Sequence, residues 1–163
     1  MYIKTPKYLL LFVVALAITL FGPKANAQTD LLPYFNTDKA GVWVDGYDPV
    51  AYITEKKAVK GKKDIFFNYK GATFRFANIK DKDLFAAKPE SYLPAYGGYC
   101  AYALGAKNEK VEVDPETFTV INGKVYLFYN KFFNNTLTDW KKDEANLNKK
   151  ADANWAKFKH KNQ

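Results

Sequence analysis

The segment 94–103 (PAYGGYCAYA) contains the one cysteine of this sequence, Cys100, and is its strongest candidate for chemistry. Gly97 and Gly98 allow the backbone to turn tightly, and the residues after them can begin a helix with Cys100 in its first turn. Amides at a helix N-terminus stabilise a thiolate, which favours a reactive or ligating thiol. Free cysteine is also among the most buried residue types. The segment therefore predicts a functional thiol, a packing residue, or an unpaired thiol that forms a disulfide between chains.

The supply of metal-binding and nucleophilic side chains is small. The 163 residues include one Cys, one His and one Met. A structural zinc site needs about four Cys or His ligands, and a soft copper site needs thiolate, thioether or imidazole groups. A nucleophilic thiol needs a base, and His160 lies close to the C-terminus, where chains usually fray. We therefore predict no catalytic residue and no cofactor, with Cys100 as the one candidate metal ligand.

A second group of candidates combines tyrosines with turn residues. Tyrosine rings offer an apolar face and a hydroxyl, which suits a small apolar or aromatic ligand or a partner surface, although the same rings can form a core. Asp48 precedes Pro49, as at a helix N-cap followed by proline at the first helical position, so its role can be structural. The ligand-binding candidates are Tyr47, Asp48, Tyr52, Tyr96, Gly97, Gly98, Tyr99, Cys100 and Tyr102.

Two β-hairpins are expected to frame these candidates. Aromatic-rich runs at 65–69 and 72–76 flank a Lys-Gly pair, which predicts the first hairpin. Runs at 117–121 and 124–129 flank Asn122-Gly123, and Asn-Gly is the strongest short hairpin signal because both turn positions need a positive φ. A Lys-rich segment, 56–63, is expected to be an exposed loop.

Helices are expected in the middle and at the end of the chain. Asn78 is expected to cap a helix over 79–88 that Pro89 ends, and that helix should turn Ile79, Leu84 and Phe85 inward. Apolar residues recur at helical spacing through the tail, with a break near Asp152: Leu137, Trp140, Leu147, Ala151, Trp155 and Phe158. These patterns predict an α+β domain with a small antiparallel sheet, made of two hairpins, packed against several helices.

The first 27 residues have the pattern of a secretory signal peptide. Lys4 and Lys7 precede an apolar run over 8–21, and Ala25-Asn26-Ala27 is a cleavage site of the A-x-A kind. Fourteen helical residues span about 21 Å, which is shorter than a bilayer core of about 30 Å. The sequence therefore predicts export to a periplasm or secretion, without a stable membrane anchor after cleavage. The expected organisation is a signal peptide (1–27), a loose N-terminal lead (28–41) and one domain (42–163).

Charge argues against nucleic acid as a partner. The chain has 25 basic and 17 acidic residues, and the signal region holds three of the basic ones, so the mature charge is +5. Arg75 is the one arginine, whereas nucleic-acid binders rely on arginine for bidentate phosphate and guanine contacts. The lysine excess is expected to be a solvated surface with a weak, unspecific attraction for anionic lipids or polymers.

Several motifs in order resemble an exported branch of the YHS-domain family, a bacterial group with a signal peptide and a Gly-Gly-Tyr-Cys motif. The resemblance begins at Val42 and continues through the second hairpin into the tail. It rests on the segments 45–52 (DGYDPVAY), 69–78 (YKGATFRFAN), 85–93 (FAAKPESYL), 96–103 (YGGYCAYA) and 151–155 (ADANW).

This resemblance implies a small domain related to the metal-binding treble-clef modules of metal-transporting ATPases and metal-linked enzymes. In such relatives one Cys follows the Asp-Pro-Val motif and two more lie in a Phe-Cys-Ser…Cys stretch. The matching positions in this chain are Ala51, Ala77 and Asp81, so all three thiols are missing. The resemblance therefore implies a treble-clef-like fold without the usual metal ligands.

Three functional hypotheses remain open from the sequence. The first is a non-enzymatic binding module of the cell envelope, whose partner is an unknown small ligand or an envelope protein. The second is metal or haem handling through Cys100, either in one chain or in a dimer where two such thiols meet. The third is a thiol enzyme with Cys100 as nucleophile or redox group. For every hypothesis we expect a buried or nearly buried thiol beside tyrosine side chains.

Overall fold

The computed structural model describes residues 34–160, and the side chains of residues 34–158. It confirms an α+β fold in which small antiparallel sheets of two strands each pack against helices. The predicted signal peptide and the first part of the lead lie outside the described residues. Within residues 34–160, no helix is long and apolar enough to span a bilayer.

The two predicted hairpins are present, and each strand pair is longer than expected at one end. Strands β1 (Lys62–Tyr69) and β2 (Ala72–Phe76) form the first, and β3 (Asp114–Ile121) and β4 (Lys124–Phe128) form the second. Both pairs have a register shift near the start of the first strand. A third, minimal hairpin, β5 (Asn130–Lys131) and β6 (Asn134–Asn135), was not predicted. Its strands are too short to show any alternation.

Short helices connect the hairpins. The helix α2 (Ala51–Thr54) precedes β1, and the helices α3 (Ile79–Ala87) and α4 (Pro89–Tyr92) follow β2. Asn78 caps α3 as predicted, because its side chain accepts a hydrogen bond from the amide of Asp81. Pro89 ends α3 and also begins α4, where proline is favoured. The inward orientation predicted for Ile79 is wrong, since it is 55% exposed at the first position of α3.

The tail forms two helices, as predicted, but they separate at another place. The helix α6 (Thr136–Trp140) ends before a turn, and α7 (Glu144–His160) runs without interruption through Asp152. The predicted break at Asp152 is therefore wrong. Asp152 instead points its carboxylate at the hydroxyl of Tyr96, which a helical position allows.

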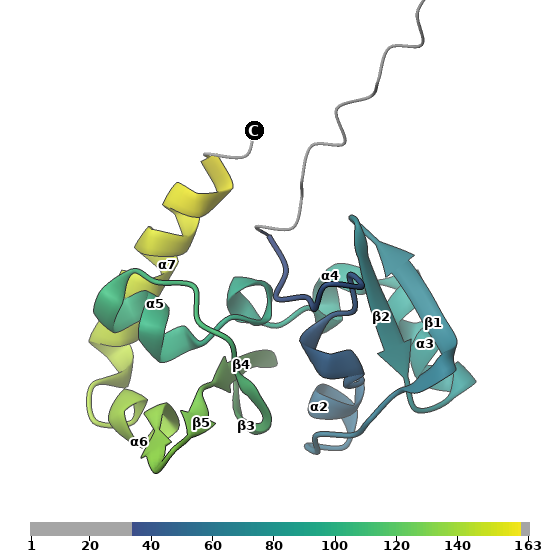
Figure 1. Cartoon of the computed structure of the whole chain (residues 1–163), viewed down its shortest axis with the longest axis horizontal. Helices are drawn as coiled ribbons and strands as arrows, with labels where there is room; N and C mark the ends of the chain where they lie inside the picture. Colours follow the sequence, from purple (N-terminus) through teal and green to yellow (C-terminus); the bar gives the residue numbers. More distant parts are fainter. Residues whose placement is uncertain (1–33, 161–163) are drawn as a thin grey trace, which may run out of the picture.

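The second hairpin lies between two groups of elements (Figure 1). One group holds α2, α3, α4 and the first hairpin, and the other holds α5 (Ala101–Lys107), α6 and α7. The buried apolar residues form two clusters, and the first of them also includes Cys100 and Ala103 at the start of α5. The chain also forms two 3-10 turns in this region, η2 (Val44–Gly46) and η3 (Ala95–Gly98). The predicted apolar stripe of the tail lies in the second cluster, with Trp140, Leu147, Ala151 and Trp155 buried.

Part of the N-terminal lead is not loose, contrary to the prediction. Phe35 is 2% exposed and packs edge-on against Phe74. The amide of Asn36 donates a hydrogen bond to the carbonyl of Gly97. Burial of an aromatic ring is a strong force for ordering a segment that has no regular structure of its own.

Candidate functional site

The nine candidate residues do not form one patch. Tyr47, Asp48 and Tyr52 lie where α2 meets the starts of β3 and α3, whereas the residues from Tyr96 to Tyr99 face the lead and α7. Cys100 and Tyr102 line a separate cleft beside β6. The candidate tyrosines therefore lie in three separate places.

Asp48 is a buried carboxylate with a structural role. Its Oδ1 accepts hydrogen bonds from the amides of Val50 (2.8 Å) and Ala51 (3.3 Å), which open α2, and its Oδ2 accepts one from the amide of Ala77 (2.8 Å). The side chain is fully buried, and this burial raises the pKa of Asp48 to about 6. The charge of Asp81 adds to that rise, while the three amides oppose it. Asp48 joins α2 to the end of β2.

The two tyrosines beside Asp48 are held by the start of β3. Tyr52 is fully buried, and its hydroxyl donates a hydrogen bond to the carbonyl of Pro115. Tyr47 is half-buried, and its hydroxyl lies 3.1 Å from a carboxylate oxygen of Glu116. Burial raises the pKa of both phenols, Tyr52 the more strongly. Both tyrosines therefore act as packing residues with satisfied hydroxyls.

The positions that the YHS resemblance aligns with thiols meet in space at Asp48. The amides of Ala51 and Ala77 donate to its carboxylate, and Asp81 is close enough to act on its charge. These residues do not fit a metal, because two of the three carry only a methyl group. The Asp48 oxygens already accept backbone hydrogen bonds, and Asp81 accepts one from the side chain of Asn78. We derive no metal chemistry at this place.

The paired glycines make a turn in which a Cβ on either glycine would approach a neighbouring residue too closely. Tyr96, Gly97 and Gly98 all have positive φ, at 57°, 63° and 95°. A Cβ on Gly97 would lie 1.9 Å from the carbonyl oxygen of Tyr34. The Gly97 carbonyl accepts hydrogen bonds from the amide of Asn36 and from Nε1 of Trp43 (3.0 Å each). The turn therefore fastens the lead and η2 to the region before α5.

A cleft of about 250 Å³ opens beside this turn; we call it the Tyr96 cleft. Tyr96 itself has a left-handed backbone, which is unusual for a bulky residue, and strained residues of this kind cluster at functional sites. Five aromatic side chains line the cleft: Tyr34, Phe35, Tyr96, Tyr126 and Trp155. Such a wall offers apolar contact to a small molecule.

Polar groups of both signs also line the Tyr96 cleft. The hydroxyl of Tyr96 lies 2.8 Å from Asn148 Oδ1 and 2.9 Å from Asp152 Oδ1. Burial and the Asp152 carboxylate raise the pKa of Tyr96, so the phenol stays protonated. Glu90 and Lys124 lie on the wall of the cleft, and Glu90 also pairs with Lys70 at 2.6 Å. Within the described residues, ion pairs join Lys70 to Glu90 and Lys142 to Asp139, and Asp152 belongs to neither.

Cys100 stands at the N-terminal end of α5, as the sequence indicated, and its side chain is fully buried. Its Sγ lies 3.4 Å from Thr136 Oγ1 and accepts a hydrogen bond from the amide of Tyr129 at 3.4 Å. The thiol also forms part of the wall of a cleft of about 210 Å³, which Tyr102 and Lys107 share. The prediction of a buried thiol beside tyrosine side chains is confirmed. Within residues 34–158, no three His, Cys, Asp or Glu side chains are grouped to hold a metal ion.

Sequence reasoning missed the contribution of α7 to the Tyr96 cleft. It assigned Trp155 to packing and Asp152 to a helix break, and it did not consider Asn148. Asn148, Asp152 and Trp155 are four and three residues apart, so they share one helix face. That spacing was a usable signal, because a polar pair beside a tryptophan is unusual on a purely packing face.

Comparisons with known proteins add no match. No family model matches the chain, and neither a curated protein nor a solved structure is similar to it. The YHS resemblance stays a prediction from the motifs.

Proposed function

We propose that this protein is an exported, non-enzymatic binding module of the cell envelope, and that its ligand site is the Tyr96 cleft. The observation that supports it best is the aromatic wall of a 250 Å³ cleft built around a strained Tyr96 and the Asp152 carboxylate. Export rests on the predicted signal peptide. Cys100 is fully buried and its Sγ contacts Thr136 Oγ1 and the amide of Tyr129, which favours a binding role over thiol catalysis.

The chemistry of the cleft suits a small ring with a hydrogen-bond donor. Ligand pockets for larger molecules usually enclose about 300–1,000 Å³, so a cleft of this size takes a compact ligand. Rings lining the wall accept an aromatic or apolar body, and the Asp152 carboxylate accepts a donor or a positive charge. Trp155 already has a cation–π contact, since the Lys110 ammonium lies 5.5 Å from the centroid of its ring.

Three matched probes test the proposal: tyramine, p-cresol and 4-hydroxyphenylacetate, which carry a positive, a neutral and a negative group on the same phenol. Binding is followed by the indole N–H signal of Trp155 in ¹H–¹⁵N spectra. We expect tyramine to bind most tightly and 4-hydroxyphenylacetate least. Shifts confined to other residues, or no shift with any probe, would contradict the proposal.

A charge variant sharpens the test. Asp152→Asn keeps an acceptor for the Tyr96 hydroxyl but removes the charge, so it should weaken tyramine binding about tenfold and leave p-cresol nearly unchanged. Asp64→Asn, an exposed position on β1, is the matched control and should change neither affinity. Equal losses for tyramine and p-cresol would show that Asp152 supports the fold rather than the ligand.

The convergence of Ala51, Ala77 and Asp81 on Asp48 supports a place in the YHS family, because residues matched to one metal site should lie together. The same convergence supports a member of that family in which the hydrogen-bonded carboxylate of Asp48 takes the place of the metal. Metal handling through Cys100 is the alternative, and its test is metal content after copper, zinc and iron loading, with Cys100→Ser as control. Equal metal content in both proteins would remove Cys100 from that role.

A further inference from the structure

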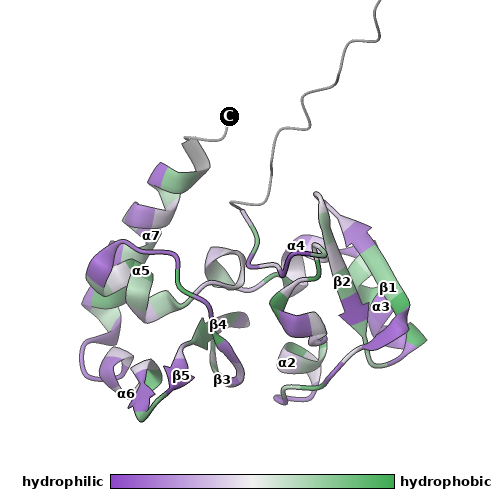
Figure 2. Cartoon of the chain, viewed as in Figure 1, coloured by the Kyte–Doolittle hydropathy of each residue, from purple (hydrophilic) through white to green (hydrophobic). Residues whose placement is uncertain are grey.

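The turn between β5 and β6 carries the two most exposed large apolar side chains among the described residues. Phe132 is 88% exposed and Phe133 is 112% exposed. By comparison, Ile79 and Phe66 are 55% and 46% exposed. Figure 2 colours the ribbon of this hairpin, which begins at the label β5, by the hydropathy of its residues. An adjacent pair of phenylalanines in water is unfavourable unless another surface covers it.

The backbone of this turn makes the phenylalanines more unusual. Phe132 and Phe133 have φ values of 52° and 63°, and the Asn122-Gly123 turn of the second hairpin has 50° and 76°. Asn-Gly is the preferred pair for such a turn, while bulky side chains are disfavoured at positive φ. Neither local conformation nor core packing therefore explains the choice of Phe-Phe.

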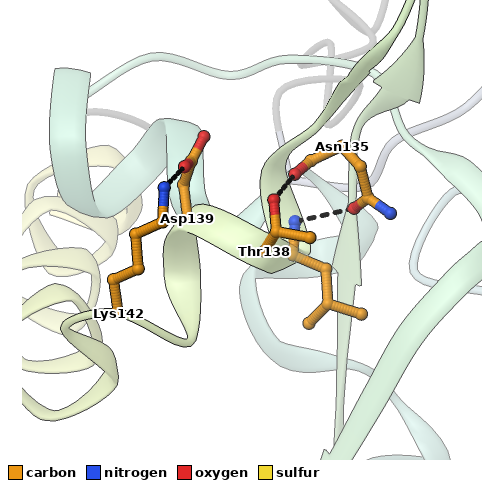
Figure 3. A network of polar contacts seen from close by, with 5 residues as sticks. Asn135, Thr138, Asp139 and Lys142 are labelled. Carbon is orange, nitrogen blue, oxygen red and sulfur yellow. Dashed lines mark hydrogen bonds and ion pairs between the residues drawn. The ribbon is translucent and has the colours of Figure 1, made fainter.

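The base of the turn is held firmly. Asn130 pairs with Asn135, and Lys131 pairs with Asn134. Asn135 then caps α6, because its side chain accepts a hydrogen bond from the amide of Leu137, and its carbonyl accepts one from Thr138 Oγ1 at 2.6 Å (Figure 3). The two rings therefore project from a fixed base.

Lysines occur next to the tip and in a second segment of the chain that reaches the same edge. Lys131 lies next to Phe132, and exposed lysines follow α2, at Lys56, Lys57, Lys60, Lys62 and Lys63. The hairpin and the chain between α2 and β1 both reach the lower edge of the molecule in Figure 1. Acids are interspersed with these lysines: Glu55 precedes them and Asp64 follows them in the chain, and Glu116 contacts the hydroxyl of Tyr47, on whose ring the Lys60 ammonium lies.

We propose that Phe132 and Phe133 insert into the interface of an anionic lipid membrane, with the lysines of this edge against the headgroups. Aromatic side chains beside lysine favour the headgroup level of a bilayer, and an anionic leaflet attracts lysines near its surface. Two phenylalanines bury about 300–500 Å², which is less than the roughly 800 Å² that a stable protein interface takes from each partner. The proposal is independent of the Tyr96 cleft.

Co-sedimentation with vesicles tests this proposal on the mature protein, after removal of the predicted signal peptide. The vesicles are pure phosphatidylcholine, or equal parts of phosphatidylcholine and phosphatidylglycerol. The test variant combines Phe132→Asn with Phe133→Gly, which gives the hairpin the preferred turn pair and so should not harm folding. We expect wild type to bind the anionic vesicles, and the variant to lose about tenfold or more of its partitioning.

The matched control is Ile79→Ser, which removes another exposed apolar side chain from a different element. It should bind anionic vesicles as wild type does. Three results would overturn the proposal: no binding of wild type to anionic vesicles, equal binding of the Asn-Gly variant, or an equal loss in the Ile79 control. A concentration-dependent dimer that the Asn-Gly variant abolishes would instead assign the tip to contact between two copies.

Discussion

Asp81, in the first turn of α3, acts on the buried carboxyl of Asp48 across the junction of two helices and a strand, and its charge raises the pKa of that carboxyl. Burial is the larger cause. The pair is notable because Asp81 is itself only 4% exposed and its hydrogen-bond partner is the amide group of Asn78 rather than a cation. The junction therefore holds the carboxyl groups of Asp48 and Asp81 close together in a place that water barely reaches.

The Asp48 pKa makes stability depend on pH in a defined window. The folded pKa is about 6, against 3.8 for the ordinary carboxyl, so between these values the folded state binds more protons than the unfolded state. The free energy of unfolding should therefore fall as the pH rises from about 4 to about 6, by on the order of 3 kcal/mol from this group. Urea unfolding across this range measures it, and ¹³C detection of the Asp48 carboxyl gives the pKa directly.

Removing the second charge should shift this titration. Asp81→Asn takes away the repulsion and should lower the pKa of Asp48, whereas Asp83→Asn, an exposed position on the same helix, should leave it unchanged. The carboxyl titration of Asp48 in both variants is the measurement. An unchanged pKa in Asp81→Asn would mean that burial alone raises it.

Gly97 and Gly123 allow two reasons for a glycine to be compared: a positive φ, which both have, and a lack of room for a Cβ, which only Gly97 has. Both have positive φ, but a Cβ on Gly97 meets the Tyr34 carbonyl at 1.9 Å, whereas a Cβ on Gly123 meets nothing within 4 Å. Gly123→Ala should destabilise by about 1 kcal/mol through its backbone alone, and Gly97→Ala by about 3 kcal/mol or more, because the lead must also move. Urea unfolding compares them, and equal losses would contradict the close approach.

Replacing the Phe132-Phe133 turn should stabilise the isolated protein. Phenylalanine at positive φ is strained, and the Asn-Gly pair is relaxed there, so the double variant should gain about 1–2 kcal/mol in the free energy of unfolding. The reverse exchange, Asn122→Phe with Gly123→Phe, should lose a similar amount. Both are measured by urea unfolding without lipid. A loss of stability in the first variant would show that the rings support the fold.

Cys100 should be unreactive in the folded protein. Its side chain is fully buried, so a thiol reagent should label it only under denaturing conditions. Cys100→Ala should also destabilise by about 1–3 kcal/mol, because the Tyr129 amide loses its acceptor. The labelling rate of native and unfolded protein is the measurement. Fast labelling of the native protein, together with a retained fold, would contradict this prediction and show that Cys100 is a reactive thiol.

Local signals in the sequence were sufficient for most elements. The Asn122-Gly123 pair determined the second hairpin because its two residues adopt positive φ at little cost. Asn78 determined the start of α3, because its side chain accepts a hydrogen bond from the amide of Asp81, only three residues further on. The apolar stripe of the tail predicted its helices, since a period of 3.6 needs no information from distant residues. Ile79 was wrongly predicted to face inward, because helical spacing alone does not show whether the side chain at the first position of a helix is covered by other residues.

The candidate sites depended on contacts between distant residues, which spacing does not encode. Tyr96 contacts Asp152, which is 56 positions away in the sequence, and Cys100 contacts Thr136, which is 36 positions away. By itself the sequence determined the α+β class, the Asn122-Gly123 turn, the Asn78 cap and the small supply of metal ligands. Only the tertiary structure decided that the tyrosines separate, that Asp48 is buried against Asp81, and that two phenylalanines stay in water. These outcomes follow from which surfaces the packed helices and hairpins cover, and packing is a property of the whole chain.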